Sequence, residues 1–333
     1  MQLLERVALV VRRQIPYAVA GWLLVDPDTL LINGVYEEGV SREVHLALID
    51  IELTADDVNK FVDLARAQVP AAALSAATGA DLGSSVRWSR VYEPAGFGDE
   101  LRAVFRTATV TWGYACLTRS ADEPWFTQRE VELLARVSPH VAHGIRAGLL
   151  LGETRAADRR ATPALVVVDD GGQIESSTPE ALDQLGTDDE GHLDATFVVH
   201  QVAAQARALA EGGVEGPPAV ARTRTADGEW LLVRAVRLEG EGGRTAVLLE
   251  PARRADVAPL LLDLHDLTPR EREVTQLLLT GMSTRAIAQK LWITPGTLRS
   301  HVKAVFAKLG VSSRPELFAR LSQEPPVRSR TSS

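Results

Sequence analysis

Apolar and polar positions near the C-terminus predict a helix with two chemically different faces over residues 295–309. Apolar residues recur there at steps of three and four positions, which places them on one side of a helix: Leu298, Val302, Val305, Phe306 and Leu309. Small, hydroxyl and cationic residues occupy the other side: Gly296, Thr297, Arg299, Ser300 and Lys303. One face therefore suits a small core, and the other suits contact with the DNA major groove.

Turn and capping signals place further short helices around the two-faced helix. Thr268 and Glu271 form a capping box, the Ser/Thr-x-x-Glu signal for a helix start. Gly281 ends that helix, Ser283 begins the next, and Thr294 caps the two-faced helix. Two short helices separated by about three residues match the helix-turn-helix pattern.

Four sequence stretches extend this match over residues 267–321. They are LTPREREV, then G-x-S-x-x-x-I-A-x-x-L, then T-x-x-T-L-R-S-H-V, and finally K-L-G-V-x-S-R. Together they closely resemble the NarL/LuxR-type C-terminal DNA-binding domain. The resemblance implies an all-α, four-helix helix-turn-helix domain, in which the third helix reads bases through Arg299, Ser300 and Lys303.

The same resemblance assigns the remaining contacts. It implies DNA-backbone contacts from Thr297, Arg285, Lys308 and Arg314. It also makes the fourth helix a dimerisation helix, with Leu317, Phe318 and Leu321 on one side. A two-fold dimer would bind an inverted repeat with half-sites about one helical turn apart. Trp292 departs from the pattern, because a small residue or Gly is frequent at that turn.

Charge is distributed unevenly along the chain. The total is −8, yet residues 266–321 hold nine Arg or Lys and four acids, a balance of +5 that leaves −13 for the rest. A basic module attached to an acidic body is typical of a protein in which one end meets phosphate and the other has a separate role.

The first 151 residues predict an α+β domain. Residues 17–25 and 30–36 look like a β-hairpin, and residues 56–67 follow a helical period. Of the two later stretches, residues 100–108 and 109–117, the second predicts a strand. Thr127 and Glu130 form another capping box, and the helix that they begin is expected to run to about residue 151.

The segment WGYACLTRSADEPWFTQREVELLARVSPHVAHGIR resembles the end of a GAF domain. This resemblance implies a sensor fold with a central antiparallel sheet, helices behind it and, in some members, a small-molecule pocket. Trp22, Phe105 and Trp112 are candidates to line such a pocket. The alternative is that these aromatic residues only fill the core.

The stretch ALVVVDDGGQIESSTPEALDQLG resembles the opening of a PAS-like domain, and three strands are predicted at residues 219–224, 229–238 and 244–250. VVVDD also resembles the start of a phosphoacceptor receiver domain. A receiver needs a later Lys, and none occurs between residues 61 and 289. The expected organisation is a GAF-like domain, a linker, a PAS-like domain, a tether, the helix-turn-helix domain and a disordered tail, at residues 1–151, 152–162, 163–250, 251–264, 265–322 and 323–333.

Motifs for catalysis, cofactors and metals are missing from the sequence. It contains no G-x-x-x-x-G-K-[ST] and no G-x-S-x-G motif, and His140 and His143 lack the further ligands of a zinc site. We therefore expect no enzyme, no cofactor and no metal. The short, charged N-terminus does not look like a signal peptide, no apolar run predicts a membrane span, and the single Cys116 fits a reducing compartment, so a cytoplasmic location is expected.

These patterns predict a dimeric, sequence-specific transcription regulator. Its expected partners are double-stranded DNA with an inverted-repeat site, a second copy of the chain, RNA polymerase and a small-molecule or protein signal, without a membrane. The alternative is a GAF–PAS signalling or protein-interaction module whose C-terminal part mediates association rather than base readout.

Overall fold

In the computed structural model, the described residues are 2–153, 162–185, 195–212, 216–225, 229–240 and 242–321. The chain forms two compact units, Met1–Pro251 and Ala252–Ser333. Most of the predicted linker 152–162 and the whole predicted tail 323–333 lie outside the described residues.

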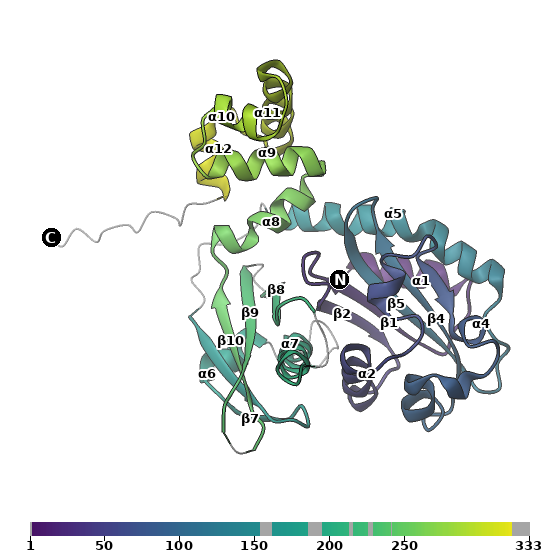
Figure 1. Cartoon of the computed structure of the whole chain (residues 1–333). Coiled ribbons are helices and arrows are strands. Elements are labelled where there is room, and N and C mark those ends of the chain that lie inside the picture. The colour runs from purple at the N-terminus through teal and green to yellow at the C-terminus, as the bar shows by residue number, and fades with distance from the viewer. Residues whose placement is uncertain are drawn as a thin grey trace. The chain divides into compact units, whose positions relative to one another are not determined.

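The first unit contains an antiparallel sheet of five strands in the order β2-β1-β5-β4-β3 (Figure 1). Its strands are β1 (Val19–Val25), β2 (Ile32–Glu38), β3 (Ala71–Ala73), β4 (Phe97–Arg106) and β5 (Thr111–Ser120). The predicted hairpin is confirmed, because β1 pairs with β2 and Trp22 lies opposite Tyr36.

One face of this sheet packs against α5 (Gln128–Glu153), which also contacts α1 (Gln2–Arg12). A Cβ at Gly113 would lie 2.5 Å from the carbonyl oxygen of Leu23 and 3.1 Å from Ile145, so only glycine fits where β5 approaches β1 and α5. The predicted capping box at the start of α5 is confirmed, because Glu130 accepts a hydrogen bond from the Thr127 amide.

The prediction of one helix over residues 56–67 is wrong. Only α3 (Phe61–Leu64) forms there, while α2 (Arg42–Thr54), for which we made no prediction, is the long helix beside the second face of the sheet. Asn59 adopts a left-handed φ of 55°, which a continuous helix excludes. The Asp57 carboxylate accepts hydrogen bonds from the Ser85 hydroxyl and the Arg87 amide. Three other short helical segments lie farther along: α4 (Leu74–Ala77), η1 (Leu82–Ser84) and η2 (Trp88–Tyr92).

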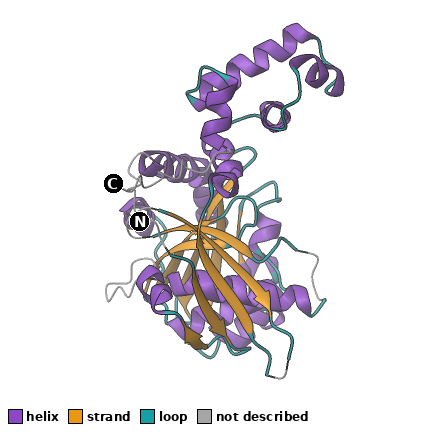
Figure 2. Cartoon of the chain, turned by 90° about the vertical axis from the view of Figure 1, so that its left-hand side faces the viewer, coloured by secondary structure: helices purple, strands orange, loops and turns teal. Residues whose placement is uncertain are grey.

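A second antiparallel sheet in the same unit has the strand order β7-β6-β10-β9-β8, which repeats the order of the first (Figure 1). Its strands are β6 (Ala164–Val168), β7 (Ile174–Ser177), β8 (Val220–Arg224), β9 (Trp230–Arg237) and β10 (Thr245–Pro251), so the three predicted later strands are confirmed. Helices α6 (Pro179–Leu185) and α7 (Ala195–Ala210) pack with this sheet, and helices surround the strands of the unit (Figure 2).

Helix α7 joins the two sheets of the first unit. Val198, Val199 and Val202 belong to the core under the second sheet, whereas Phe197 belongs to the core of the first. Helix α7 also packs directly on α2 and β2. Helix α7 therefore packs against both sheets and joins their cores.

The second unit is all-α, so the predicted fold class, two α+β folds followed by a helical domain, is confirmed. Its helices are α8 (Arg254–Leu264), α9 (Pro269–Leu279), α10 (Thr284–Lys290), α11 (Pro295–Leu309) and α12 (Arg314–Leu321). Helix α8 lies in the segment predicted as a tether and packs on α12. Among the residues that the structure describes, no helix is both long and apolar enough to cross a membrane.

Candidate nucleic-acid interface and sensor cavity

Helix α11 has the two faces that the sequence predicts. Its first turn is capped by the Thr294 side chain, which accepts a hydrogen bond from the Thr297 amide at 3.1 Å, and Gly310 closes the helix with a left-handed φ of 62°. The side chains of Leu298, Val305 and Leu309 are fully buried in the helical core. The burial of this stripe fixes which side of α11 faces outward.

The three predicted base-reading residues lie on the outward side of α11. Arg299, Ser300 and Lys303 are all exposed. In the described part of the chain, neither Arg299 nor Lys303 forms a side-chain hydrogen bond or ion pair, while the Ser300 hydroxyl donates to the Gly296 carbonyl at 3.3 Å. The two cationic side chains are thus available for a ligand without breaking an internal contact.

The predicted backbone contacts fall into two groups. Thr297 and Arg285 are exposed near the starts of α11 and α10. Lys308 instead donates to Glu271 at 2.6 Å and to the Asp266 carbonyl at 2.9 Å, and Arg314 donates to the Leu278 carbonyl. Lys308 and Arg314 therefore stabilise the helical unit, a role that the sequence pattern did not reveal.

The three residues predicted for dimerisation also differ from one another. Leu317 and Leu321 are buried inside the unit, where α12 packs on α8 and α9, whereas Phe318 is 43% exposed. Of the three side chains, Phe318 alone presents a large apolar surface to a partner.

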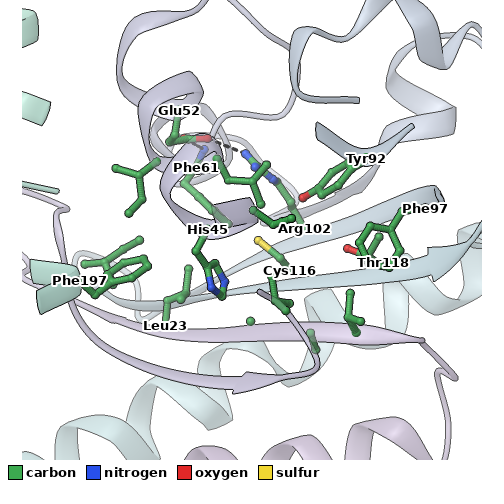
Figure 3. A pocket seen from close by; sticks show the side chains of 18 of the residues that line it. Leu23, His45, Glu52, Phe61, Tyr92, Phe97, Arg102, Cys116, Thr118 and Phe197 are labelled. Atoms are coloured by element: carbon green, nitrogen blue, oxygen red, sulfur yellow. Dashed lines mark hydrogen bonds and ion pairs between the residues drawn. The ribbon is translucent and has the colours of Figure 1, made fainter. Parts of the chain in front are cut away.

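The first unit contains a cavity of about 60 Å³ between the sheet, α2 and α7 (Figure 3). Its lining includes Gly21, His45, Arg102, Cys116 and Phe197, which come from five different elements.

The aromatic residues proposed from the sequence for a pocket do not line this cavity. Trp22, Phe105 and Trp112 are at most 1% exposed and are absent from its lining. Trp22 stacks on Phe105 with ring centroids 6.1 Å apart, on the opposite face of the sheet from Gly21, because side chains alternate along a strand. These residues fill the core on one face of the sheet, and the cavity lies on the other face.

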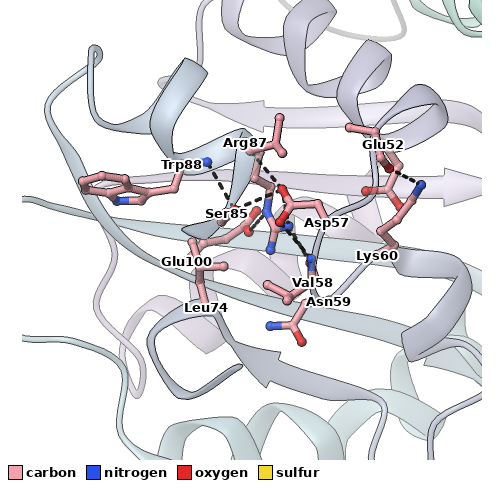
Figure 4. Close-up of polar contacts among 12 residues, drawn as sticks. Glu52, Asp57, Val58, Asn59, Lys60, Leu74, Ser85, Arg87, Trp88 and Glu100 are labelled. Carbon is pink, nitrogen blue, oxygen red and sulfur yellow. Dashed lines mark hydrogen bonds and ion pairs between the residues drawn. The ribbon is translucent and has the colours of Figure 1, made fainter. Parts of the chain in front are cut away.

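Buried ion pairs connect the cavity wall to the core, and Figure 4 shows the part of them around Arg87, with Asp57 and Glu100. The Glu100 carboxylate accepts hydrogen bonds from Arg87 at 2.6 Å, Arg102 at 2.9 Å and the Tyr92 hydroxyl at 2.6 Å. Burial opposes its ionisation, but the nearby Arg102 and Arg87 charges outweigh this effect and lower the pKa of Glu100 to about 2. Burial raises the pKa of the Cys116 thiol to about 12, so the thiol is protonated at neutral pH.

Comparison with known proteins identifies the helical unit. Residues 265–321 match the model of the bacterial regulatory proteins, luxR family. The C-terminal domain is a LuxR-family helix-turn-helix domain. The chain is 36% identical over 77 residues to the nitrate/nitrite response regulator protein NarL of Escherichia coli, covering 23% of this chain and 36% of NarL. It is 39% identical over 72 residues to a NarL transcriptional regulatory protein of Mycobacterium tuberculosis, covering 22% of this chain and 31% of that protein.

The chain thus spans about a third of the length of these relatives. Two solved structures show weaker likeness. The GAF domain of a sensor histidine kinase from Bacillus halodurans is 13% identical, with a TM-score of 0.32, covering 45% of this chain and 96% of that chain. SdiA of Escherichia coli is 11% identical, with a TM-score of 0.33, covering 96% of this chain and 90% of that chain. Both TM-scores are low, and these likenesses carry no functional conclusion.

Trp292 is the most unusual surface residue of the LuxR-family domain. It lies in the turn before α11 with a left-handed φ of 55°, and its side chain is 94% exposed. We expect Trp292→Asn to raise the free energy of unfolding by roughly 1 kcal/mol, because Asn tolerates this conformation better than other L-residues with a side chain. Chemical denaturation provides the measurement. Trp292→Ala is the matched control: it removes the indole but keeps the Cβ, so a similar gain in both variants would show that backbone strain is not the cause.

Proposed function

We propose that this protein is a sequence-specific DNA-binding transcription regulator. In this proposal the first unit senses a small-molecule or protein signal and sets the dimer geometry of the LuxR-family domains. The observation that carries the proposal is the outward face of α11, where Arg299, Ser300 and Lys303 are exposed while the opposite face forms the core. The protein acts by binding rather than by catalysis, in the cytoplasm, with no cofactor and no membrane partner.

The chemistry of α11 fits base reading in the major groove. Arg299 and Lys303 are one helical turn apart, so both side chains can enter the groove together. Either can donate hydrogen bonds to the O6 and N7 atoms of guanine. Thr297 and Arg285, with the exposed amides at the starts of α10 and α11, would contact phosphates. Lys308 and Arg314 would do so only by exchanging their internal partners.

A dimer is the second part of the proposal. Phe318 is the exposed apolar residue of α12, and a two-fold contact there would bring two copies of α11 to the same side of the DNA. The expected site is an inverted repeat with half-sites about one helical turn apart. RNA polymerase would be a partner of the DNA-bound dimer.

The full chain and its Arg299→Ala and Lys303→Ala variants provide the test. A duplex enriched from a random library by the wild-type protein serves as the specific site, and scrambled DNA serves as the non-specific one. Each variant is expected to lose roughly 1–3 kcal/mol of specific binding, about 5- to 150-fold in Kd, because each loses a base contact. Both side chains are exposed and form no hydrogen bond or ion pair with the residues that the structure describes, so thermal stability should not change.

Gln276→Ala, an exposed change on α9, serves as the control and should retain wild-type affinity. Equal specific affinity of all four proteins would contradict the assignment of base reading to α11. Failure to enrich any duplex would favour the alternative, in which the C-terminal domain mediates association.

A further inference from the structure

The cavity of the first unit combines an apolar wall with polar side chains that each keep one atom without a hydrogen-bond partner among the described residues. Its volume of about 60 Å³ exceeds the roughly 10–15 Å³ that one water molecule needs. Apolar side chains supply much of the wall: Leu23, Val44, Leu48, Phe61, Phe97 and Phe197. The space is small, so a molecule that binds there must be compact.

His45 points a ring nitrogen into this space. The residue is 8% exposed, and its Nδ1 atom lies 2.5 Å from the Glu37 carboxylate. Its Nε2 atom would lie 3.8 Å from a Cβ added at Gly21, so it faces the strand floor of the cavity (Figure 3). Among the described residues, no side chain or backbone group bonds to this Nε2 atom.

Arg102 and Thr118 add two further polar groups to the lining. Arg102 is 2% exposed, with its Nε atom bound to Glu100 at 2.9 Å and its Nη1 atom bound to Glu52 at 2.6 Å. Within the described part of the chain, the Arg102 Nη2 atom and the Thr118 hydroxyl have no hydrogen-bond partner. Both groups can therefore donate hydrogen bonds to an oxygen of a bound molecule.

The charges around the cavity favour a neutral molecule. The positive charge of Arg102 is compensated by Glu100 and Glu52, and Glu52 itself lines the cavity. An anion would meet the Glu52 carboxylate, and a cation would meet the Arg102 guanidinium.

We propose that the cavity binds an uncharged small molecule with a compact apolar body and at least one carbonyl or hydroxyl oxygen, and that helix α7 closes over it. This inference deepens the proposed sensing function and rests on it. The oxygen of the bound molecule accepts hydrogen bonds from the Arg102 guanidinium, while its apolar body lies among the aliphatic and aromatic residues.

Helix α7 couples this cavity to the second sheet. Phe197 and the His45 ring form a T-shaped pair, with centroids 5.7 Å apart and an interplanar angle of 86°. Gln201 lines the cavity and accepts a hydrogen bond from the Ile32 amide. The other side of α7 packs under the second sheet through Val199 and Val202. A molecule that moves His45 or Phe197 therefore also shifts the packing of the second sheet.

Thermal unfolding of the full chain with two probes of nearly equal shape tests the chemistry of the site. Cyclopentanone carries a carbonyl, and methylenecyclopentane carries a CH₂ group in its place. We expect cyclopentanone at about ten times its Kd to raise Tm by roughly 2–4 °C, and methylenecyclopentane at the same concentration to raise it less. In the Thr118→Val variant, the shifts in Tm caused by the two probes should differ less than they do in the wild type.

Two changes at Gly21 test the position of the site. A Cβ at Gly21 would make only ordinary contacts, so Gly21→Ala should fold normally and bind more weakly, whereas Gly21→Leu fills the cavity and should abolish the shift in Tm. Equal shifts with the two probes would overturn the assigned ligand class. No shift in the wild type, or a full shift in Gly21→Ala and Gly21→Leu, would overturn the site.

The DNA affinity of the full chain, measured with and without cyclopentanone, separates this inference from the proposed function. A probe that binds the cavity without changing DNA affinity supports the site and contradicts the proposed sensing role. A probe that changes DNA affinity equally in wild type and Gly21→Leu acts elsewhere and contradicts the site.

Discussion

Arg222→Met is expected to destabilise the first unit by roughly 3–5 kcal/mol. Arg222 lies on β8 of the second sheet, and its guanidinium donates two hydrogen bonds of 2.7 Å to the Asp26 carboxylate at the end of β1. Asp26 is completely buried and Arg222 is 5% exposed. Removing the cation leaves a carboxylate without its charge partner in a site that water does not reach, and this desolvation dominates the loss.

Hydrogen exchange of the β1 and β8 amides in the full chain measures this effect locally. Arg234→Met is the matched control, because Arg234 is an exposed arginine of the same sheet, and its change should stay within about 0.5 kcal/mol. The double variant Asp26→Leu with Arg222→Met removes both charges and should be less destabilised than Arg222→Met alone. Equal protection in wild type and Arg222→Met would show that the pair does not hold the two sheets together.

This ion pair fixes the two sheets to one another. It lies at the same boundary as α7, whose residues Phe197 and Gln201 line the cavity. If a ligand shifts α7, the Arg222–Asp26 pair would keep the two sheets together. The helix would then move between the sheets without separating them.

The LuxR-family domain could be predicted closely from the sequence because its signals are local. Thr268 and Glu271 cap α9, and Thr294 caps α11. Of the five apolar positions predicted for α11, Leu298, Val305 and Leu309 are buried, and Val302 and Phe306 are partly buried. The expected limits of the two-faced helix, residues 295–309, agree with those of α11. Each of these signals acts within one or two helical turns, so no knowledge of the tertiary fold is needed.

Features that depend on contacts between distant residues could not be predicted. Arg222 and Asp26 are 196 positions apart, and neither stands in a local motif. The same holds for Phe197, whose place in the core of the first sheet follows from how α7 packs on α2. The choice of Trp22, Phe105 and Trp112 as pocket residues relied on residue type, which does not reveal the face of the sheet that carries the cavity.

Glu100→Gln is the second change with a large expected effect. At neutral pH we expect a loss of roughly 3–5 kcal/mol from the free energy of unfolding, because two buried guanidiniums, Arg87 and Arg102, lose their shared carboxylate. Glu93→Gln, an exposed change on the same unit, should stay within about 0.5 kcal/mol of wild type.

The pH dependence of this effect has a defined sign. The folded-state pKa of Glu100 is lowered from 4.5 to about 2, so its contribution is fully present above the unfolded pKa and is lost as the pH falls from about 5 toward 2. The shift corresponds to about 3 kcal/mol. Denaturation midpoints measured between pH 7 and pH 2.5 should therefore converge for wild type and Glu100→Gln. Because the Gln side chain does not titrate, a gap that stays constant over this range would show that the charge of Glu100 is not what stabilises the wall of the cavity.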